Sequence, residues 1–83
     1  MEAYPDLNEA LGRVLKRRRE ALGLSKRYLA KLARLERVYI IQLERGDKCP
    51  TLNAVFYLCD ALEITRSEFM TKVESEMKLL RGE

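Results

Sequence analysis

The feature that most constrains the fold of this chain is the segment from Ser25 to Gly46, SKRYLAKLARLERVYIIQLERG. Apolar residues recur at helical spacing on both sides of Arg34, which predicts two short helices joined by a tight turn at Arg34 and Leu35. The Ser25 hydroxyl is placed to cap the first helix, Glu36 is a non-ideal cap for the second, and Gly46 is placed to end it. The apolar positions of the segment are Ala30, Leu32, Ala33, Leu35, Ile40 and Leu43.

The second predicted helix, residues 36–45, carries apolar side chains on both faces, although only one face is expected to pack against the rest of the chain. At about 100° per residue, Ile40, Leu43 and Glu44 share the face that we expect to pack inward. A partner surface that accepts both hydrogen bonds and methyl contacts would explain the opposite face, and the DNA major groove is such a surface. That face consists of Val38, Ile41, Gln42 and Arg45, with Arg37 near the first turn and Tyr39 at the flank.

Lys26 and Arg27 lie in the first turn of the first predicted helix, where the helix dipole disfavours an exposed cation by about 0.3–1 kcal/mol. A bound phosphate would reverse this preference, because backbone N–H groups and both side chains would converge on an anion. The alternative interpretation is a solvated basic turn. Beside a helix suited to the major groove, we favour a phosphate contact.

Four pieces of the sequence match a known pattern: GLS at Gly23–Ser25, LAKLA at Leu29–Ala33, YIIQLERG at Tyr39–Gly46, and Pro50 followed by TLNAVFYLCDALEI. Through them, residues 11–69 resemble the Cro/repressor-type (Xre) helix-turn-helix family of DNA-binding regulators, which includes restriction–modification controller proteins. The resemblance implies an all-α, five-helix, lambda-repressor-like domain over residues 1–83, with the motif at 25–46. It also implies that the first motif helix crosses the DNA backbone while the second lies in the major groove.

The resemblance gives roles to individual residues. Lys26 matches a position close to phosphate, and Tyr39 matches one that can approach DNA in controller proteins. The family pairs an arginine of its first helix with the glutamate that ends the recognition helix, and these positions are Arg19 and Glu44 here. The positions that read bases in the family are occupied by Arg37, Val38, Ile41 and Gln42.

Three residues depart from the family's pattern. Lys26 replaces the usual glutamine, which argues against a base contact at that position. Arg34 replaces the common turn glycine, so the backbone must accept strain or take another conformation. Glu36 replaces a serine or threonine cap, and its carboxylate would be repelled by DNA unless it caps the helix.

Positive charge is concentrated in the middle of the chain, although the 83 residues carry a net charge of only +3. Residues 13–48 hold 12 Lys and Arg against 4 Asp and Glu, whereas the segments on either side are net negative. A basic middle indicates one face that meets an anionic ligand, and it suits the phosphate backbone of DNA. The predicted phosphate contacts are therefore Lys26, Arg27 and, from the loop at 47–50, Lys48.

Length and composition predict a single small domain with one core. A hydrophobic content of 47% and a charged content of 35% argue against both a disordered chain and a membrane protein. The longest apolar-rich run is far shorter than the ~20 residues of a membrane span. The N-terminus is acidic and lacks the apolar core of a signal peptide, so we expect a cytoplasmic protein.

Further helices are predicted on both sides of the motif. The first covers residues 7–22 and carries the basic run Lys16–Arg19, of which only Arg19 is expected to turn inward. A fourth helix runs from a Thr51 cap to residue 62, and a fifth from a Thr65–Glu68 capping box to residue 80. The residues expected to face inward on the fourth helix are Leu52, Val55, Phe56, Cys59 and Leu62.

The helix at 65–80 carries more apolar surface than one small domain needs to cover. We favour a symmetric homodimer, because a two-fold dimer presents two recognition helices to a palindromic site, as the resemblance to controller proteins also implies. The alternative is an over-long helix with a frayed, mildly apolar end. The predicted interface comprises Tyr57, Met70, Val73, Met77 and Leu80.

The sequence gives no support for catalysis, since it has no histidine, no nucleophile elbow and no phosphate-cradling glycine loop. Cys49 and Cys59 are expected to be free thiols, with no metal site and no cofactor. No effector pocket is evident. The competing hypothesis is a protein-interaction module, such as an antitoxin, whose partner interface would be less sensitive to salt than contacts with DNA phosphates.

Overall fold

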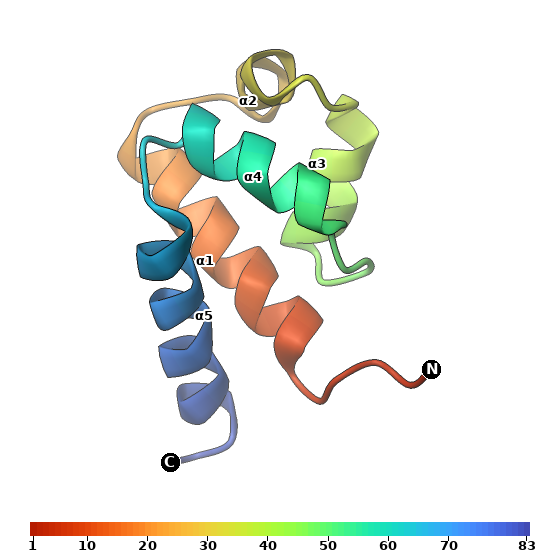
Figure 1. Ribbon diagram of the computed structural model, residues 1–83, viewed down its shortest axis with the longest axis vertical. Helices are drawn as coiled ribbons and strands as arrows, with labels where there is room; N and C mark the ends of the chain where they lie inside the picture. Colours follow the sequence, from red (N-terminus) through yellow and green to blue (C-terminus); the bar gives the residue numbers. More distant parts are fainter.

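The computed structural model describes residues 1–83, which form five α-helices and no strand (Figure 1). The all-α prediction is confirmed, and the predicted helix ends agree with the structure to within one residue. The helices are α1 (Leu7–Ala21), α2 (Lys26–Ala33), α3 (Arg37–Glu44), α4 (Leu52–Ala61) and α5 (Arg66–Leu80).

Three of the helices begin at a hydroxyl cap, as the sequence predicts. Ser25 Oγ accepts a hydrogen bond from the backbone N–H of Tyr28 at 3.0 Å, and Thr51 Oγ1 accepts one from Ala54 at 3.1 Å. At the start of α5, Thr65 Oγ1 accepts the backbone N–H of Glu68 and also bonds the Glu68 carboxylate, each at 3.0 Å. Each cap satisfies an otherwise orphan donor, which fixes where the helix starts.

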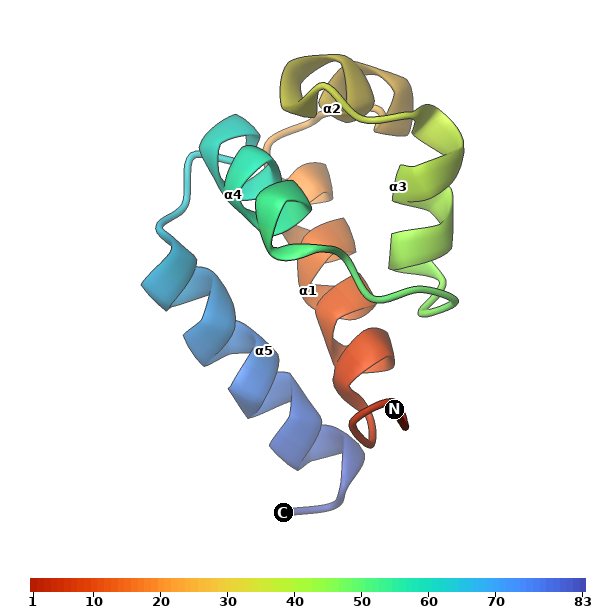
Figure 2. The ribbon, with the colours of Figure 1, turned by 45° about the vertical axis from the view of Figure 1, so that its right-hand side comes forward.

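Helix α1 is the centre of the molecule, with α3 on one side of it and α5 on the other (Figures 1 and 2). The approach of α1 to α3 is close because Gly12 has no side chain: a Cβ built there would lie 2.8 Å from the carbonyl oxygen of Glu44 and closer still to that of Leu43. Helices α2 and α4 complete the core. Its fully buried large side chains are Phe69, Leu15, Leu29, Ile40, Leu43, Leu58, Leu62, Val73 and Cys59.

Two residues predicted to face the core, Leu52 and Phe56, are exposed, and so is Leu32, one of the apolar positions of the motif. Leu52 is 74% exposed, Phe56 47% and Leu32 45%. Ala54 and Leu58 fill the positions that the first two were expected to take. The prediction was wrong because α4 is apolar over more than one face, so helical spacing alone does not determine which face packs inward.

The predicted dimer interface also needs correction. Val73 is 1% exposed and Met77 is 8% exposed, so both belong to the core of one chain and have no surface to offer a partner. Tyr57 is exposed, whereas Met70 and Leu80 are half-buried at the edge of the core.

The expectation that the basic run on α1 is a solvated face holds for Lys16, which is exposed, but not for Arg17 and Arg18, which bond other helices. Arg17 bonds the Glu76 carboxylate of α5, and Arg19 bonds that of Glu44 at the end of α3. Between them, Arg18 donates from Nε to the carbonyl oxygen of Leu62 at 2.8 Å and from Nη2 to that of the next residue at 2.9 Å. These carbonyls belong to the two residues that follow α4, and no backbone N–H bonds to either of them. Consecutive arginines thus attach α1 to three different helices.

Glu76 is a buried carboxylate that sequence reasoning missed. It is 3% exposed and accepts hydrogen bonds from Arg17 and, at 3.4 Å, from Arg13 Nη1. The hydrogen bond from Arg17 is the main reason that the pKa of the Glu76 carboxyl lies below its usual range. The predicted free thiols are present, with Cys49 exposed and Cys59 buried, and burial raises the pKa of the Cys59 thiol.

Glu76→Gln should reduce the acid sensitivity of the fold. Because the folded-state pKa of Glu76 is lower than its unfolded value, the ionised carboxylate stabilises the fold above about pH 5, and this contribution is lost as the pH falls through the folded pKa. We expect the variant to be less stable than the parent at pH 7 and to lose less stability on acidification. Urea unfolding followed by circular dichroism from pH 7 to about pH 3 measures both effects. The exposed Glu74→Gln on the same helix is the control, and equal pH dependence in the two variants would contradict the assignment.

Candidate nucleic-acid interface

The turn between α2 and α3 depends on Arg34, which has φ 57° and ψ 38° in the left-handed region. The backbone N–H of Leu35 donates to the carbonyl oxygen of Ala30 at 2.9 Å and closes the end of α2. A residue with a Cβ therefore occupies the conformation that glycine adopts at least cost. The departure from the family's glycine leaves the motif geometry in place.

Glu36 is the N-cap residue of α3, as predicted, but its side chain makes no capping hydrogen bond. It has φ −76° and ψ 143°, and its backbone carbonyl accepts the first hydrogen bonds of the helix. The exposed carboxylate lies at the positive end of the α3 dipole, which favours an anion there. A phosphate approaching the start of α3 would meet this negative charge.

Helix α3 has one buried and one open face, as its periodicity predicts. Ile40 and Leu43 are fully buried, which fixes the rotation of the helix about its axis. On the opposite side, Val38 is 59% exposed. The open face also includes exposed Arg37 and Arg45 and half-buried Ile41 and Gln42. The four predicted base-reading residues therefore lie together on the accessible side of one helix.

The ion pair between Arg19 and Glu44 holds the end of α3 against α1. Arg19 Nε lies 2.6 Å from Glu44 Oε2 and Nη2 lies 3.0 Å from Oε1, while Nη1 donates to the carbonyl oxygen of Leu24 at 2.8 Å. The exposed side-chain fractions are 9% for Arg19 and 4% for Glu44. The hydrogen bond with Glu44 is the main cause that raises the pKa of Arg19. This predicted pair is therefore present in bidentate form.

Tyr39 lies at the flank of α3 and connects it to α4. Its hydroxyl oxygen accepts a hydrogen bond from the backbone N–H of Thr51 at 3.3 Å, and its ring packs against the core. The hydroxyl proton stays available to an acceptor at the surface. Tyr39 is thus both a packing residue and a candidate donor to DNA.

The cations of the motif differ from those of α1 because none of them forms an ion pair. Lys26 and Arg27 are exposed in the first turn of α2, and Lys48 is exposed in the loop after α3. Arg45 was not among the DNA contacts predicted from the sequence. It follows Ile41 and Gln42 by one helical turn, is exposed and also forms no ion pair. The free cations of the motif are Lys26, Arg27, Lys31, Arg34, Arg37, Arg45 and Lys48.

The structure supports neither a metal site nor a membrane-spanning helix. No cluster of three or more His, Cys, Asp or Glu residues is arranged to hold a metal ion. None of the helices combines the length and the apolar character needed to cross a bilayer.

Comparison with known proteins relates this geometry to characterised structures. The family described as helix-turn-helix domain matches residues 10–69. The clp gene regulator ClgR from Corynebacterium glutamicum shares 30% sequence identity over 96% of this chain and 85% of its own, with a TM-score of 0.89. The restriction–modification controller protein C.AhdI from Aeromonas hydrophila shares 38% identity over 80% of this chain and 98% of its own, with a TM-score of 0.74.

A third solved structure includes DNA. It is the tetramer of the restriction–modification controller protein C.Esp1396I in complex with its natural 35 base-pair operator. This protein shares 25% identity over 92% of the present chain and 97% of its own, with a TM-score of 0.79. The search of curated protein sequences found no significant match.

Arg19→Met should destabilise the fold by about 3–5 kcal/mol, because it leaves the buried Glu44 carboxylate without its partner. The double variant Arg19→Met/Glu44→Leu should recover most of this loss, because no uncompensated charge remains. Urea unfolding of both variants measures the difference, and Lys16→Met on the exposed side of α1 is the control. A double variant as unstable as the sum of the two single changes would show that the residues do not act as a pair.

Proposed function

The chain belongs to the Xre-type helix-turn-helix family of DNA-binding regulators, and we propose that it acts as a homodimer on a two-fold symmetric operator. The observation that carries the proposal is the open face of α3. Val38 is left 59% exposed beside Arg37, on a helix whose other face is fixed by buried side chains and by the Arg19–Glu44 pair. A surface that mixes a guanidinium with aliphatic groups matches the major groove.

In this proposal Arg37 and Gln42 read base edges through hydrogen bonds, while Val38 and Ile41 contact thymine methyl groups. Arg37 is free to do so because no carboxylate neutralises it. Tyr39 adds a contact from the flank.

Phosphate contacts come from Lys26 and Arg27, which precede α3 in the sequence, and from Lys48, which follows it. All three are exposed and form no ion pair within the chain. Arg45 joins them as a cation on the α3 face itself. Lys26 and Arg27 lie at the N-terminus of α2, where the dipole and the free backbone N–H groups also attract an anion. These contacts position the protein on duplex DNA, whereas the α3 face selects the sequence.

The dimer is supported by apolar surface on α4 and α5. Phe56 and Tyr57 are 47% and 46% exposed, and the Arg66 guanidinium lies 4.3 Å from the centroid of the Phe56 ring. Met70 follows Arg66 by one turn on the same side of α5 and is half-buried. The controller protein C.Esp1396I binds its operator as a tetramer, which supports oligomeric binding here as well. We place Tyr57, Met70 and Leu80 at the interface, and we infer a cytoplasmic, non-enzymatic regulator.

Selection of bound sequences from a random duplex pool, at two salt concentrations, tests this function. We expect an enriched palindrome with half-sites about one helical turn apart. Its binding should weaken with salt at a log–log slope of about −0.9 per phosphate contact. Analytical ultracentrifugation of the free protein and of the complex measures the stoichiometry. Binding without any enriched sequence would favour the competing hypothesis of a protein-interaction module, such as an antitoxin.

Two substitutions separate base contacts from phosphate contacts. Arg37→Ala should weaken binding to the selected operator by about 1–3 kcal/mol and relax the preference at one base position. Lys26→Ala should weaken binding to all duplexes alike and reduce the magnitude of the salt slope by about 1. Lys78→Ala, exposed on α5, is the control. An unchanged base preference in Arg37→Ala would disprove its assignment as a base-reading residue.

A further inference from the structure

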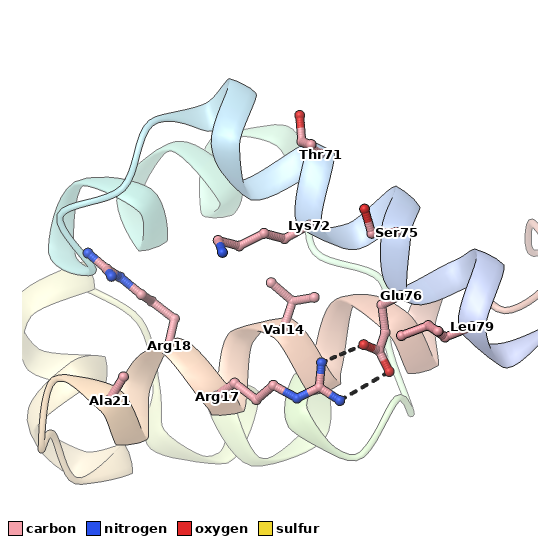
Figure 3. A pocket seen from close by; sticks show the side chains of 9 residues that line it. All are labelled: Val14, Arg17, Arg18, Ala21, Thr71, Lys72, Ser75, Glu76 and Leu79. Carbon is pink, nitrogen blue, oxygen red and sulfur yellow. Dashed lines mark hydrogen bonds and ion pairs between the residues drawn. The ribbon is translucent and has the colours of Figure 1, made fainter.

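A groove of about 610 Å³ runs along the surface between α1 and α5, and it has no role in the proposed function (Figure 3). Its apolar lining comes from Val14, Ala21 and Leu79, the last of which is 67% exposed. We propose that this groove is a docking site for an acidic amphipathic helix of a partner protein.

The shape of the groove favours a helix as its occupant. Both walls present side chains at the same spacing: positions 14, 17, 18 and 21 on α1, and positions 72, 75, 76 and 79 on α5, where Thr71 extends the lining by one further residue. In each set the later positions follow the first by three, four and seven residues. Side chains at this spacing form a stripe about two turns long on one side of a helix. Two parallel stripes separated by a groove can receive a third helix, whose apolar face packs between them.

The charge of the groove favours an acidic occupant. Arg17, Arg18 and Lys72 line it, and its one carboxylate, Glu76, is already bonded by Arg17. Lys72 forms no ion pair. In Figure 3 Lys72 extends from α5 over the groove in the direction of the Arg18 side chain. A helix with leucine on one face and glutamate at its edges would therefore meet Lys72 on the α5 rim and, on the α1 rim, Arg18, whose guanidinium bonds backbone carbonyls and no carboxylate.

The groove is compatible with DNA binding and with the proposed dimer. Gly12 faces α3, and Ala21 follows it by nine residues, so the two lie on opposite sides of α1 at about 100° per residue. The same nine-residue separation places Met70 and Leu79 on opposite sides of α5. Figures 1 and 2 likewise show α3 and α5 on opposite sides of α1. A partner in the groove would leave the recognition helix and Met70 of the proposed dimer surface free.

The test uses the full chain and a designed probe, a stapled peptide helix of about four turns with leucine on one face and glutamate on the other. A second peptide with lysine in place of glutamate is the charge control. We expect the acidic peptide to shift the amide NMR signals of Ala21 and Leu79 and to bind in fluorescence anisotropy, and the lysine peptide to do neither. Lys72→Glu and Leu79→Glu should each weaken this binding by about tenfold or more.

The matched control variant is Lys78→Glu, which makes the same charge change on the same helix outside the groove. It should bind the acidic peptide like the parent, and all three variants should bind operator DNA like the parent. The proposal is overturned if Lys72→Glu binds the peptide normally or if the lysine peptide binds equally well. It is also overturned if citrate alone produces the same shifts, or if Lys72→Glu changes the oligomeric state. These last results would identify a small-anion site or an interface between copies of this chain.

Discussion

The bidentate ion pair between Arg19 and Glu44 determines where the recognition helix can lie. Glu44 ends α3, so a guanidinium that bonds both of its carboxylate oxygens fixes the far end of that helix against α1. Removing two charges from water offsets much of their attraction, so the pair contributes more to orientation than to net stability. The absence of a side chain at Gly12 allows the two backbones to come close enough for this contact. The orientation of the open face of α3 therefore depends on an interaction on the opposite side of the same helix.

The charges of the molecule fall into two groups with different functions. Arg13, Arg17, Arg18 and Arg19 on α1 are used inside the chain, in bonds to carboxylates or to backbone carbonyls. The cations of α2, α3 and the following loop are free. A net charge of +3 hides this division, because the anions that balance the total lie mainly outside the motif. The result is a domain that is close to neutral as a whole yet strongly basic where an anion would bind.

The sequence and its family resemblance were sufficient to predict the five helices, the motif and the Arg19–Glu44 pair, but not which face of α4 is buried. Caps and turns depend on single residues, and Ser25, Thr51 and Thr65 marked helix starts correctly. Leu52 and Phe56 were misplaced because α4 has apolar side chains over most of its circumference, so only tertiary contacts select the buried side. Glu76 was missed because a carboxylate between two core positions of α5 becomes favourable only when arginines from a distant segment reach it. The base-reading and phosphate assignments follow from position in the motif and from exposure, both of which the sequence pattern indicates.

In the run Lys16–Arg19, the chemical similarity of lysine and arginine does not predict at which positions one can replace the other. Successive residues on a helix point about 100° apart, so neighbours in this run face different surroundings. Arg17, Arg18 and Arg19 each offer a planar fork to at least two acceptors, which the single ammonium of lysine cannot match. Lys16 lies in solvent without a partner, and either basic residue would serve there. In a relative of this protein, an arginine-to-lysine exchange would thus be silent at the first position of the run and disruptive at the following three, although the local charge would be identical in every case.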